Sequence, residues 1–241
     1  MVNEPRGFLG VLGGMGPVAT ADFLMKLAIE TPAQRDQDHF STIVYSDPST
    51  PDRSDAILGI GPNPLPAVLQ GIDFLNDAGV DGIAIPCNSA HFWYSKIAER
   101  SRVPVLHIVD SVAHRIRKEA PALRTVGVMS TDGTAHARLY RRLTDFGIGV
   151  FDFTDMAEDS PAMIGIRRVK EGRLSSGRDI LLQAAERLVS RGAEGIVFGC
   201  TDISAAMGGE NVDGVTVPTW DSAVSLAKAS VDFMVGIGHE G

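Results

Sequence analysis

An internal repeat is the feature of this sequence that most constrains its fold. Residues 75–87 read Leu-x3-Gly-x2-Gly-Ile-x3-Cys, and residues 188–200 repeat that pattern at a constant offset of 113 residues. In each copy a helical stretch ends at a glycine, and a short apolar strand then leads to a cysteine. Residues 11–16 and 128–133 echo each other as Val-x4-Gly between a strand and a helix. The chain is therefore expected to consist of two similar units.

Both units alternate short apolar runs with amphipathic stretches, which is typical of parallel sheets covered by helices. The strands are expected at residues 7–12, 42–45, 82–86, 103–108, 124–129, 149–151 and 195–198. The helices are expected at residues 20–30, 66–78, 90–100, 110–119, 135–146, 161–171, 178–191 and 222–235.

The predicted fold class is α/β, with two pseudo-symmetric domains, each a parallel sheet flanked by helices, and an active site in the cleft between them. Residues 1–108 and 218–241 are expected to form the first domain, and residues 109–217 the second. The length of 241 residues suits this division, because α/β units of about 100–150 residues are common.

The net charge of the chain limits the kinds of molecule that it is expected to bind. Acidic residues outnumber basic ones by 30 to 22, which gives a net charge of −8 and argues against a nucleic-acid or anionic-membrane partner. A local basic pocket for a small acidic ligand remains compatible with this balance. The sequence holds no apolar run long enough to span a bilayer.

The beginning of the chain resembles a signal peptide only in part. Residues 7–21 are uncharged and end in Ala-Thr-Ala, but Glu4 offsets Arg6 and the segment is rich in glycine. We therefore expect a cytoplasmic protein, in which thiols stay reduced.

The chain has two cysteines, which allow one disulfide, two buried core thiols or two reactive thiols, but no four-cysteine metal site. Cys87 and Cys200 each follow a predicted strand, at the sheet edge where parallel sheets bind ligands. Both cysteines are followed by polar residues, Asn88-Ser89 and Thr201-Asp202. A cysteine that only fills the core would be followed by further apolar residues. If the two units face each other, the thiols share one cleft. Opposed thiols suit proton removal from one face of a carbon and proton return to the other.

Four motifs resemble the aspartate/glutamate racemase superfamily, and the aspartate racemases within it most closely. They are Gly-Gly-Met-Gly-Pro at residues 13–17, Pro-Asp-Arg at 51–53, Pro-Cys-Asn-Ser-Ala-His at 86–91 and Gly-Cys-Thr-Asp at 199–202. The resemblance runs from about residue 7 to residue 235. It implies a pyridoxal-phosphate-independent, two-base racemase that acts on a small acidic amino acid, has two pseudo-symmetric domains and forms a homodimer.

The resemblance assigns roles to individual residues. It makes Cys87 and Cys200 the catalytic bases. The substrate-binding residues that it implies are Met15, Arg53, Asn88, Ser89, Lys170 and Thr201. Arg53 and Lys170 would contact the distal carboxylate of the substrate, and Asn88 and Ser89 its α-carboxylate and ammonium. The alternatives are structural: helix caps for Asn88, Ser89 and Thr201, a tight turn at residues 13–17, and solvent-exposed cations for Arg53 and Lys170.

Two positions depart from the family pattern. Asp202 stands where the family usually has glutamate, and Ser89 where threonine is usual. We assign Asp202 a supporting role, and the two changes leave the identity of the substrate open more than the reaction. His91 and His107 are excluded from the catalytic set, because a lone histidine is more often structural.

Several functions remain open. Aspartate racemisation is the first hypothesis. Related folds host glutamate and hydantoin racemases, maleate isomerases and arylmalonate decarboxylases. Decarboxylases need one cysteine, whereas maleate isomerases keep two. A different class is a non-catalytic binding protein or a thiol redox sensor, whose cysteines must approach closely enough to bridge.

Overall fold

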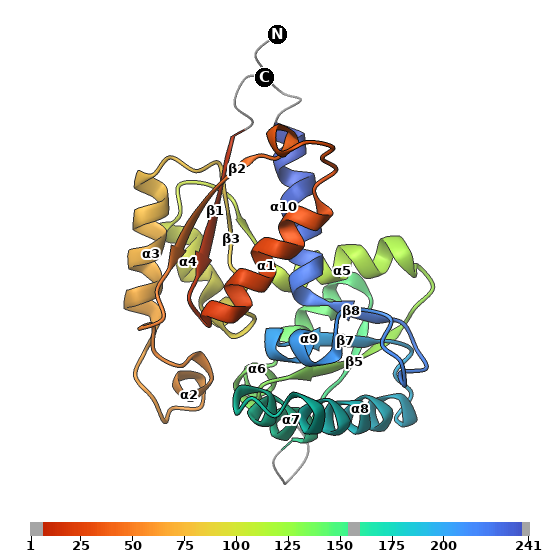
Figure 1. Cartoon of the computed structure of the whole chain (residues 1–241). Coiled ribbons are helices and arrows are strands. Elements are labelled where there is room, and N and C mark those ends of the chain that lie inside the picture. The colour runs from red at the N-terminus through yellow and green to blue at the C-terminus, as the bar shows by residue number, and fades with distance from the viewer. Residues whose placement is uncertain (1–6, 154–159, 238–241) are drawn as a thin grey trace.

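The computed structural model describes residues 7–153 and 160–237, and its strands form two separate sheets (Figure 1). The first sheet has the order β2-β1-β3-β4, with β1 at Phe8–Gly13, β2 at Ser41–Ser46, β3 at Gly82–Ala84 and β4 at Val105–Leu106. The second has the order β6-β5-β7-β8, with β5 at Thr125–Ser130, β6 at Gly149–Phe151, β7 at Ile196–Gly199 and β8 at Thr219–Asp221. All neighbouring strands are parallel. The two orders are equivalent, which confirms the predicted α/β fold of two similar halves.

Helices cover both sheets. They are α1 (Pro17–Glu30), α2 (Arg53–Ile57), α3 (Leu65–Asp77), α4 (Tyr94–Arg100), α5 (Ile108–Glu119), α6 (Asp132–His136), α7 (Pro161–Lys170), α8 (Leu174–Ser190), α9 (Thr201–Met207) and α10 (Ser222–Ile237). Three 3-10 segments are η1 (Asp36–Asp38), η2 (Ser89–Trp93) and η3 (Leu139–Phe146). Among the described residues, none of these helices has the length and apolar composition that crossing a bilayer requires.

One hydrophobic cluster joins the two halves. Val11 and Ala84 from the first sheet belong to the same buried cluster as Val126 and Val197 from the second. Helix α10 follows the last strand of the second sheet and runs back beside α1, and it also packs against α5 (Figure 1). A shared core holds the two sheets in a fixed relation, as a site built between them requires.

The domain division stays a prediction. Strand β8 pairs with β7, so residues 219–221 belong to the second sheet although the predicted division assigns them to the first domain. We propose that the second unit extends to Asp221 and that α10 alone returns to the first. Glu4 and Arg6, which decided the reading of the chain start, lie outside the described residues.

Local details differ from the sequence expectations. The helix expected at residues 135–146 is instead α6 followed by η3, because Arg138 adopts a left-handed conformation with φ of 51° between them. The strand expected at residues 103–108 shortens to β4, because the side chain of His107 accepts the Val109 N–H and α5 begins at Ile108. The short elements α2, α9 and β8 were not predicted.

Candidate active site

Both cysteines line one cavity of about 430 Å³ between the two halves. All nine residues singled out from the sequence line it: Met15, Arg53, Cys87, Asn88, Ser89, Lys170, Cys200, Thr201 and Asp202. The repeat explains this convergence. Strands β3 and β7 occupy equivalent places in their sheets, and each leads to a cysteine at the carboxyl end of a strand. The structure brings the predicted residues together, while their roles remain to be tested.

The two thiols are free and nearly buried. Cys87 is 7% exposed and Cys200 is 9% exposed, and neither forms a disulfide. Cys200 directly precedes α9 in an extended conformation. Cys87 lies just ahead of η2. Each thiol therefore reaches the cavity from a loop that is fixed by a buried strand behind it.

The surroundings of Cys200 favour its protonated form. Burial, then the negative charge of Asp202, raises the pKa of the Cys200 thiol to about 12, although the Asp202 backbone N–H and Lys170 act in the opposite direction. The Cys200 Sγ donates to Asp202 Oδ2 at 3.8 Å, and the same oxygen is 3.9 Å from Lys170 Nζ. At neutral pH, Cys200 is thus positioned as a proton donor.

His91 fixes the loop that carries Cys87. The ring is buried, and its Nε2 accepts the backbone N–H of Ile108 at 3.2 Å. Its Nδ1 must then carry the proton and donate to the Cys87 carbonyl at 2.9 Å. Burial lowers the pKa of His91, which keeps the ring neutral. This histidine contacts the cysteine through its backbone carbonyl, and its exclusion from the catalytic set stays a prediction.

Asn88 is held on both sides of its amide. Tyr140 Oη donates to Asn88 Oδ1 at 2.6 Å, and Asn88 Nδ2 donates to Ser222 Oγ at 3.0 Å. The second N–H of Nδ2 and the remaining lone pair of Oδ1 are the groups that the amide has left to offer the cavity. A fixed N–H donor suits a carboxylate and a fixed carbonyl acceptor suits an ammonium, so the predicted contacts with the α-carboxylate and the ammonium both stay predictions.

A chain of hydroxyl groups crosses between the halves at the cavity. Ser54 donates to Thr131 at 2.9 Å, Thr131 donates to Thr134 at 3.1 Å, and Thr134 shares a hydrogen bond of 3.0 Å with Ser89. Gly133 permits the approach, since a Cβ there would lie 2.6 Å from the Ser54 Cα. Three of these hydroxyls, those of Ser54, Ser89 and Thr131, line the cavity.

Arg53 holds the loops of the cavity wall. Its guanidinium donates to the carbonyls of Thr50, Pro51 and Met15 at 3.0, 2.9 and 2.8 Å. Five N–H groups belong to a guanidinium, so two have no acceptor among the described residues. These two N–H groups are available for the predicted contact with a substrate carboxylate. The hydrogen bond to the Met15 carbonyl gives Arg53 a second role, the positioning of Met15, which the sequence did not reveal.

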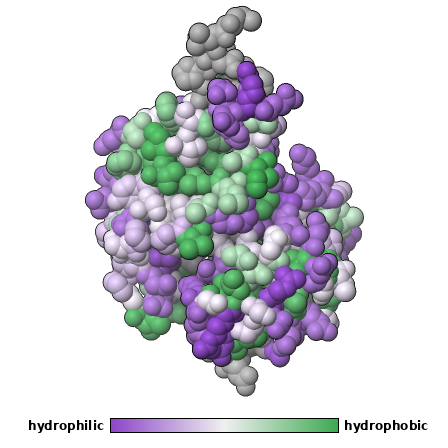
Figure 2. All heavy atoms as spheres, viewed as in Figure 1, coloured by the Kyte–Doolittle hydropathy of each residue, from purple (hydrophilic) through white to green (hydrophobic). Residues whose placement is uncertain are grey.

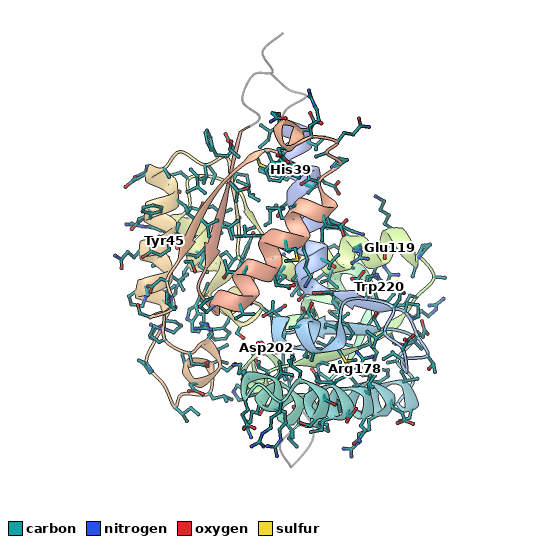
Figure 3. The ribbon with its side chains drawn as sticks, in the orientation of Figure 1. His39, Tyr45, Glu119, Arg178, Asp202 and Trp220 are labelled. Atoms are coloured by element: carbon teal, nitrogen blue, oxygen red, sulfur yellow. The ribbon has the colours of Figure 1, made fainter. Side chains whose placement is uncertain are left out.

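The positive charge of Lys170, the second predicted cationic contact, is partly compensated by Asp202. Lys170 ends α7, is half-exposed and forms an ion pair with Asp202. Asp202 lies at the start of α9, in the region between α1 and α7 (Figure 3). Thr201 precedes it and also lines the cavity. No group of three or more His, Cys, Asp or Glu side chains in the described part of the chain is arranged to hold a metal ion.

The sequence missed Tyr140, Ser222, Ser54, Thr131 and Thr134. A signal existed for Thr131. Residues 11–16 echo residues 128–133, and the first of these segments leads into the Gly-rich turn that was assigned to the site. Applying the repeat to the equivalent turn would have placed Thr131 at the cavity.

The chain matches the Asp/Glu/Hydantoin racemase family model over residues 12–229. It belongs to this family. It is thus an amino-acid racemase, an enzyme of the isomerase class. The broad specificity amino-acid racemase RacX of Bacillus subtilis (strain 168) is 29% identical over 227 residues, which cover 92% of this chain and 96% of RacX.

Solved structures give the same fold. The Picrophilus torridus aspartate racemase superposes with a TM-score of 0.80 at 27% identity, covering 95% of this chain and 94% of the other. The glutamate racemase of Francisella tularensis subsp. tularensis SCHU S4, in complex with D-glutamate, gives a TM-score of 0.68 at 17% identity, covering 97% and 82%. Because the identity to the Francisella enzyme is only 17%, this similarity concerns the fold alone.

Proposed function

We propose that this racemase interconverts L- and D-aspartate by a cofactor-independent, two-base proton transfer between Cys87 and Cys200. The observation that carries the proposal is the presence of two free thiols, from equivalent strand ends, in one cavity. Arg53 and Lys170 add positive charge to the wall of that cavity. In an acidic protein, these two side chains give a small dicarboxylate a local site.

The two thiol groups together supply and accept every proton that the reaction moves. One thiolate removes the α-proton and becomes a thiol, which leaves a carbanion whose charge spreads onto the α-carboxylate. The opposing thiol donates its proton to the other face and becomes a thiolate. Proton exchange with water restores the starting distribution. Because the pKa of Cys200 is raised to about 12, the enzyme at neutral pH starts with the proton on Cys200.

Chiral analysis tests the proposed reaction. L-Aspartate incubated with the enzyme, without pyridoxal phosphate, is expected to become an equal mixture of enantiomers, and in D₂O the product carries deuterium at the α-carbon. L-Glutamate and maleate are incubated in parallel. Racemisation of glutamate alone, or conversion of maleate to fumarate without racemisation, would replace the proposed substrate. No reaction with any of them would point to another amino acid as the substrate.

The pH profile tests the role of Asp202. Because enantiomers have equal free energies, kcat/KM is the same in both directions and falls at alkaline pH when the donor thiol is lost. With a Cys200 pKa of about 12, loss of the Cys200 proton is expected to cause no decline of kcat/KM below about pH 10. Asp202→Asn removes a charge that raises this pKa, so the decline moves to lower pH.

Lys170→Met is the matched variant for this pH profile. Lys170 lowers the pKa of Cys200, so its removal shifts the alkaline decline in the opposite direction, to higher pH. At pH 11, Asp202→Asn is thus expected to have lost more of its activity than Lys170→Met, and rates measured from pH 6 to pH 11 for the wild type and both variants test this order. A decline that moves up in Asp202→Asn, or is identical in the two variants, contradicts this electrostatic account.

We also propose that the enzyme forms a homodimer through the outer face of α1. Ala21, Met25, Ala28 and Ile29 are exposed along that helix. Figure 2 shows hydrophobic residues on the face of the molecule that carries α1. Charged residues of the helix pair within the chain, since Lys26 bonds Asp221 at 3.0 Å and Glu30 lies 3.7 Å from Lys228. An uncharged, self-complementary stripe suits a second copy.

Light scattering tests the dimer. The wild type is expected at twice the chain mass of 25.6 kDa, and Met25→Glu at the mass of one chain, because a dimer would bury the new charge against apolar surface. Ile164→Glu, on exposed α7, is the control and keeps the dimer. A monomeric wild type at micromolar concentration would remove this proposal.

A further inference from the structure

Tyr140 is a buried side chain that contacts the loops of both cysteines. It lies in η3, is 3% exposed and is not one of the residues that line the cavity. Its hydroxyl donates to Asn88 Oδ1 at 2.6 Å, and Asn88 directly follows Cys87. Its aromatic ring packs against Gly199, which directly precedes Cys200. A single side chain of the second half thus contacts the neighbour of each cysteine.

The contact between Tyr140 and Gly199 depends on the missing side chain of the glycine. A Cβ at residue 199 would lie 2.8 Å from Tyr140 Cε2, which is closer than nonbonded carbon atoms approach. Gly199 is the last residue of β7, and it lines the cavity. The aromatic ring therefore lies directly against the end of the strand that leads to Cys200, and its removal would leave this strand end without that support.

The hydroxyl of Tyr140 belongs to a closed network of three side chains. Tyr140 donates to Asn88, Asn88 Nδ2 donates to Ser222 Oγ at 3.0 Å, and Ser222 is hydrogen-bonded to Tyr140. All three residues are buried, and they come from η3, from the loop before η2 and from the start of α10. Turning the Asn88 amide out of this network would leave buried polar groups without partners, which is costly. The network therefore fixes the residue that follows Cys87.

Tyr140 does not exchange a proton with the substrate. Burial raises the pKa of its hydroxyl, and the carboxylate of Asp221 acts in the same direction, although the hydrogen bond with Ser222 opposes both. The phenol is therefore neutral at the pH of the reaction, and it lies outside the cavity lining. What Tyr140 contributes to the site passes through its contacts with Asn88 and Gly199.

We infer that Tyr140 is a positioning residue of the active site, which holds the loops of Cys87 and Cys200 at a fixed separation and fixes the amide of Asn88. This inference rests on the proposed two-thiol racemisation, in which the α-carbon of the substrate must lie between the two thiols. Misplacement of a catalytic group by about 1 Å costs about 100-fold in rate. A side chain that contacts both loops therefore controls the rate without touching the substrate.

Double-mutant analysis of Tyr140 and Asn88 tests this role. Tyr140→Phe removes the hydroxyl and keeps the aromatic ring against Gly199, so it is expected to lower kcat/KM for L-aspartate about tenfold, the scale of one lost hydrogen bond. Asn88→Ala is expected to lower it further, because it removes the side chain that is proposed to bind the substrate. In the Asn88→Ala background, Tyr140→Phe is expected to cause less than about a twofold further loss, because the residue through which the hydroxyl acts is absent.

Tyr140→Leu tests the contact with Gly199 separately. It removes the aromatic ring as well as the hydroxyl, so it is expected to lower kcat/KM about tenfold more than Tyr140→Phe, with or without Asn88. Tyr94→Phe is the matched control. It also removes a phenolic hydroxyl, but one that donates to the Val105 carbonyl at 2.9 Å and not to a neighbour of either cysteine. Its kcat/KM is expected within twofold of the wild type, and melting temperatures check that every variant is folded at the assay temperature.

The outcomes separate this inference from the proposed function. Equal losses on Tyr140→Phe with and without Asn88, or wild-type activity in Tyr140→Phe, overturn the positioning role and leave the proposed function standing. A tenfold loss in Tyr94→Phe also overturns it, because removal of any such hydroxyl would then suffice. If the wild type racemises another amino acid instead of aspartate, only the proposed substrate is wrong, and the same variants are compared on that amino acid. Racemisation at the wild-type rate by Cys87→Ala overturns the proposed mechanism, and the positioning role with it.

Discussion

Replacing either Cys87 or Cys200 with alanine is expected to lower kcat/KM for racemisation by at least about a thousandfold in both directions, because general acid–base groups contribute about 10²–10⁴-fold each. In the proposed mechanism, each direction needs one thiol group as base and the other as acid. Removal of either one therefore interrupts both directions, and the equal free energies of the enantiomers require the losses to match.

Exchange experiments on these variants separate the two faces of the substrate. In D₂O the remaining thiol can still remove and return a proton on its own side, so each variant is expected to exchange the α-proton of one enantiomer only, without inversion. Cys87→Ala and Cys200→Ala should favour opposite enantiomers. Cys→Ser variants, which preserve volume in these buried positions, serve as the folding control. Racemisation at the wild-type rate by any of the four variants would contradict the two-base mechanism.

Sequence reasoning succeeded where the site depends on strand ends. Cys87 and Cys200 follow strands with equivalent places in two sheets, and the 113-residue offset between them marks this equivalence in the sequence itself. A strand end is a local property that apolar runs and glycines mark, and parallel sheets gather such ends at one edge. The family motifs then supplied Arg53 and Lys170, which do line the cavity.

Sequence reasoning failed where the site depends on how the halves meet. Tyr140 bonds Asn88 across 52 residues of sequence, and Ser54 bonds Thr131 across 77. Neither contact follows from periodicity, because both form only after the two sheets pack on a shared core. Arg138 shows a second limit: a left-handed arginine interrupts a stretch whose helical spacing looks continuous.

Arg53 is expected to give the second large effect. Arg53→Ala should lower kcat/KM for L-aspartate about 100-fold, because it removes the proposed charge-assisted contact with the substrate and releases the Met15 carbonyl that the guanidinium holds at 2.8 Å. Loss of the three carbonyl contacts should also cost about 2 kcal/mol of stability, or about 6 °C in Tm. Arg53→Lys should not restore activity, because an ammonium cannot span three carbonyls and a carboxylate.

The comparison of L-aspartate with L-asparagine separates the two roles of Arg53. If the guanidinium only positions Met15 and the neighbouring loop, Arg53→Ala lowers α-proton exchange equally for both amino acids. If it also contacts the distal carboxylate, the loss is larger for aspartate, because asparagine has the same shape without the charge. We expect the larger loss for aspartate, since two N–H groups of Arg53 have no acceptor among the described residues. Retention of aspartate activity within twofold in Arg53→Ala would exclude both roles.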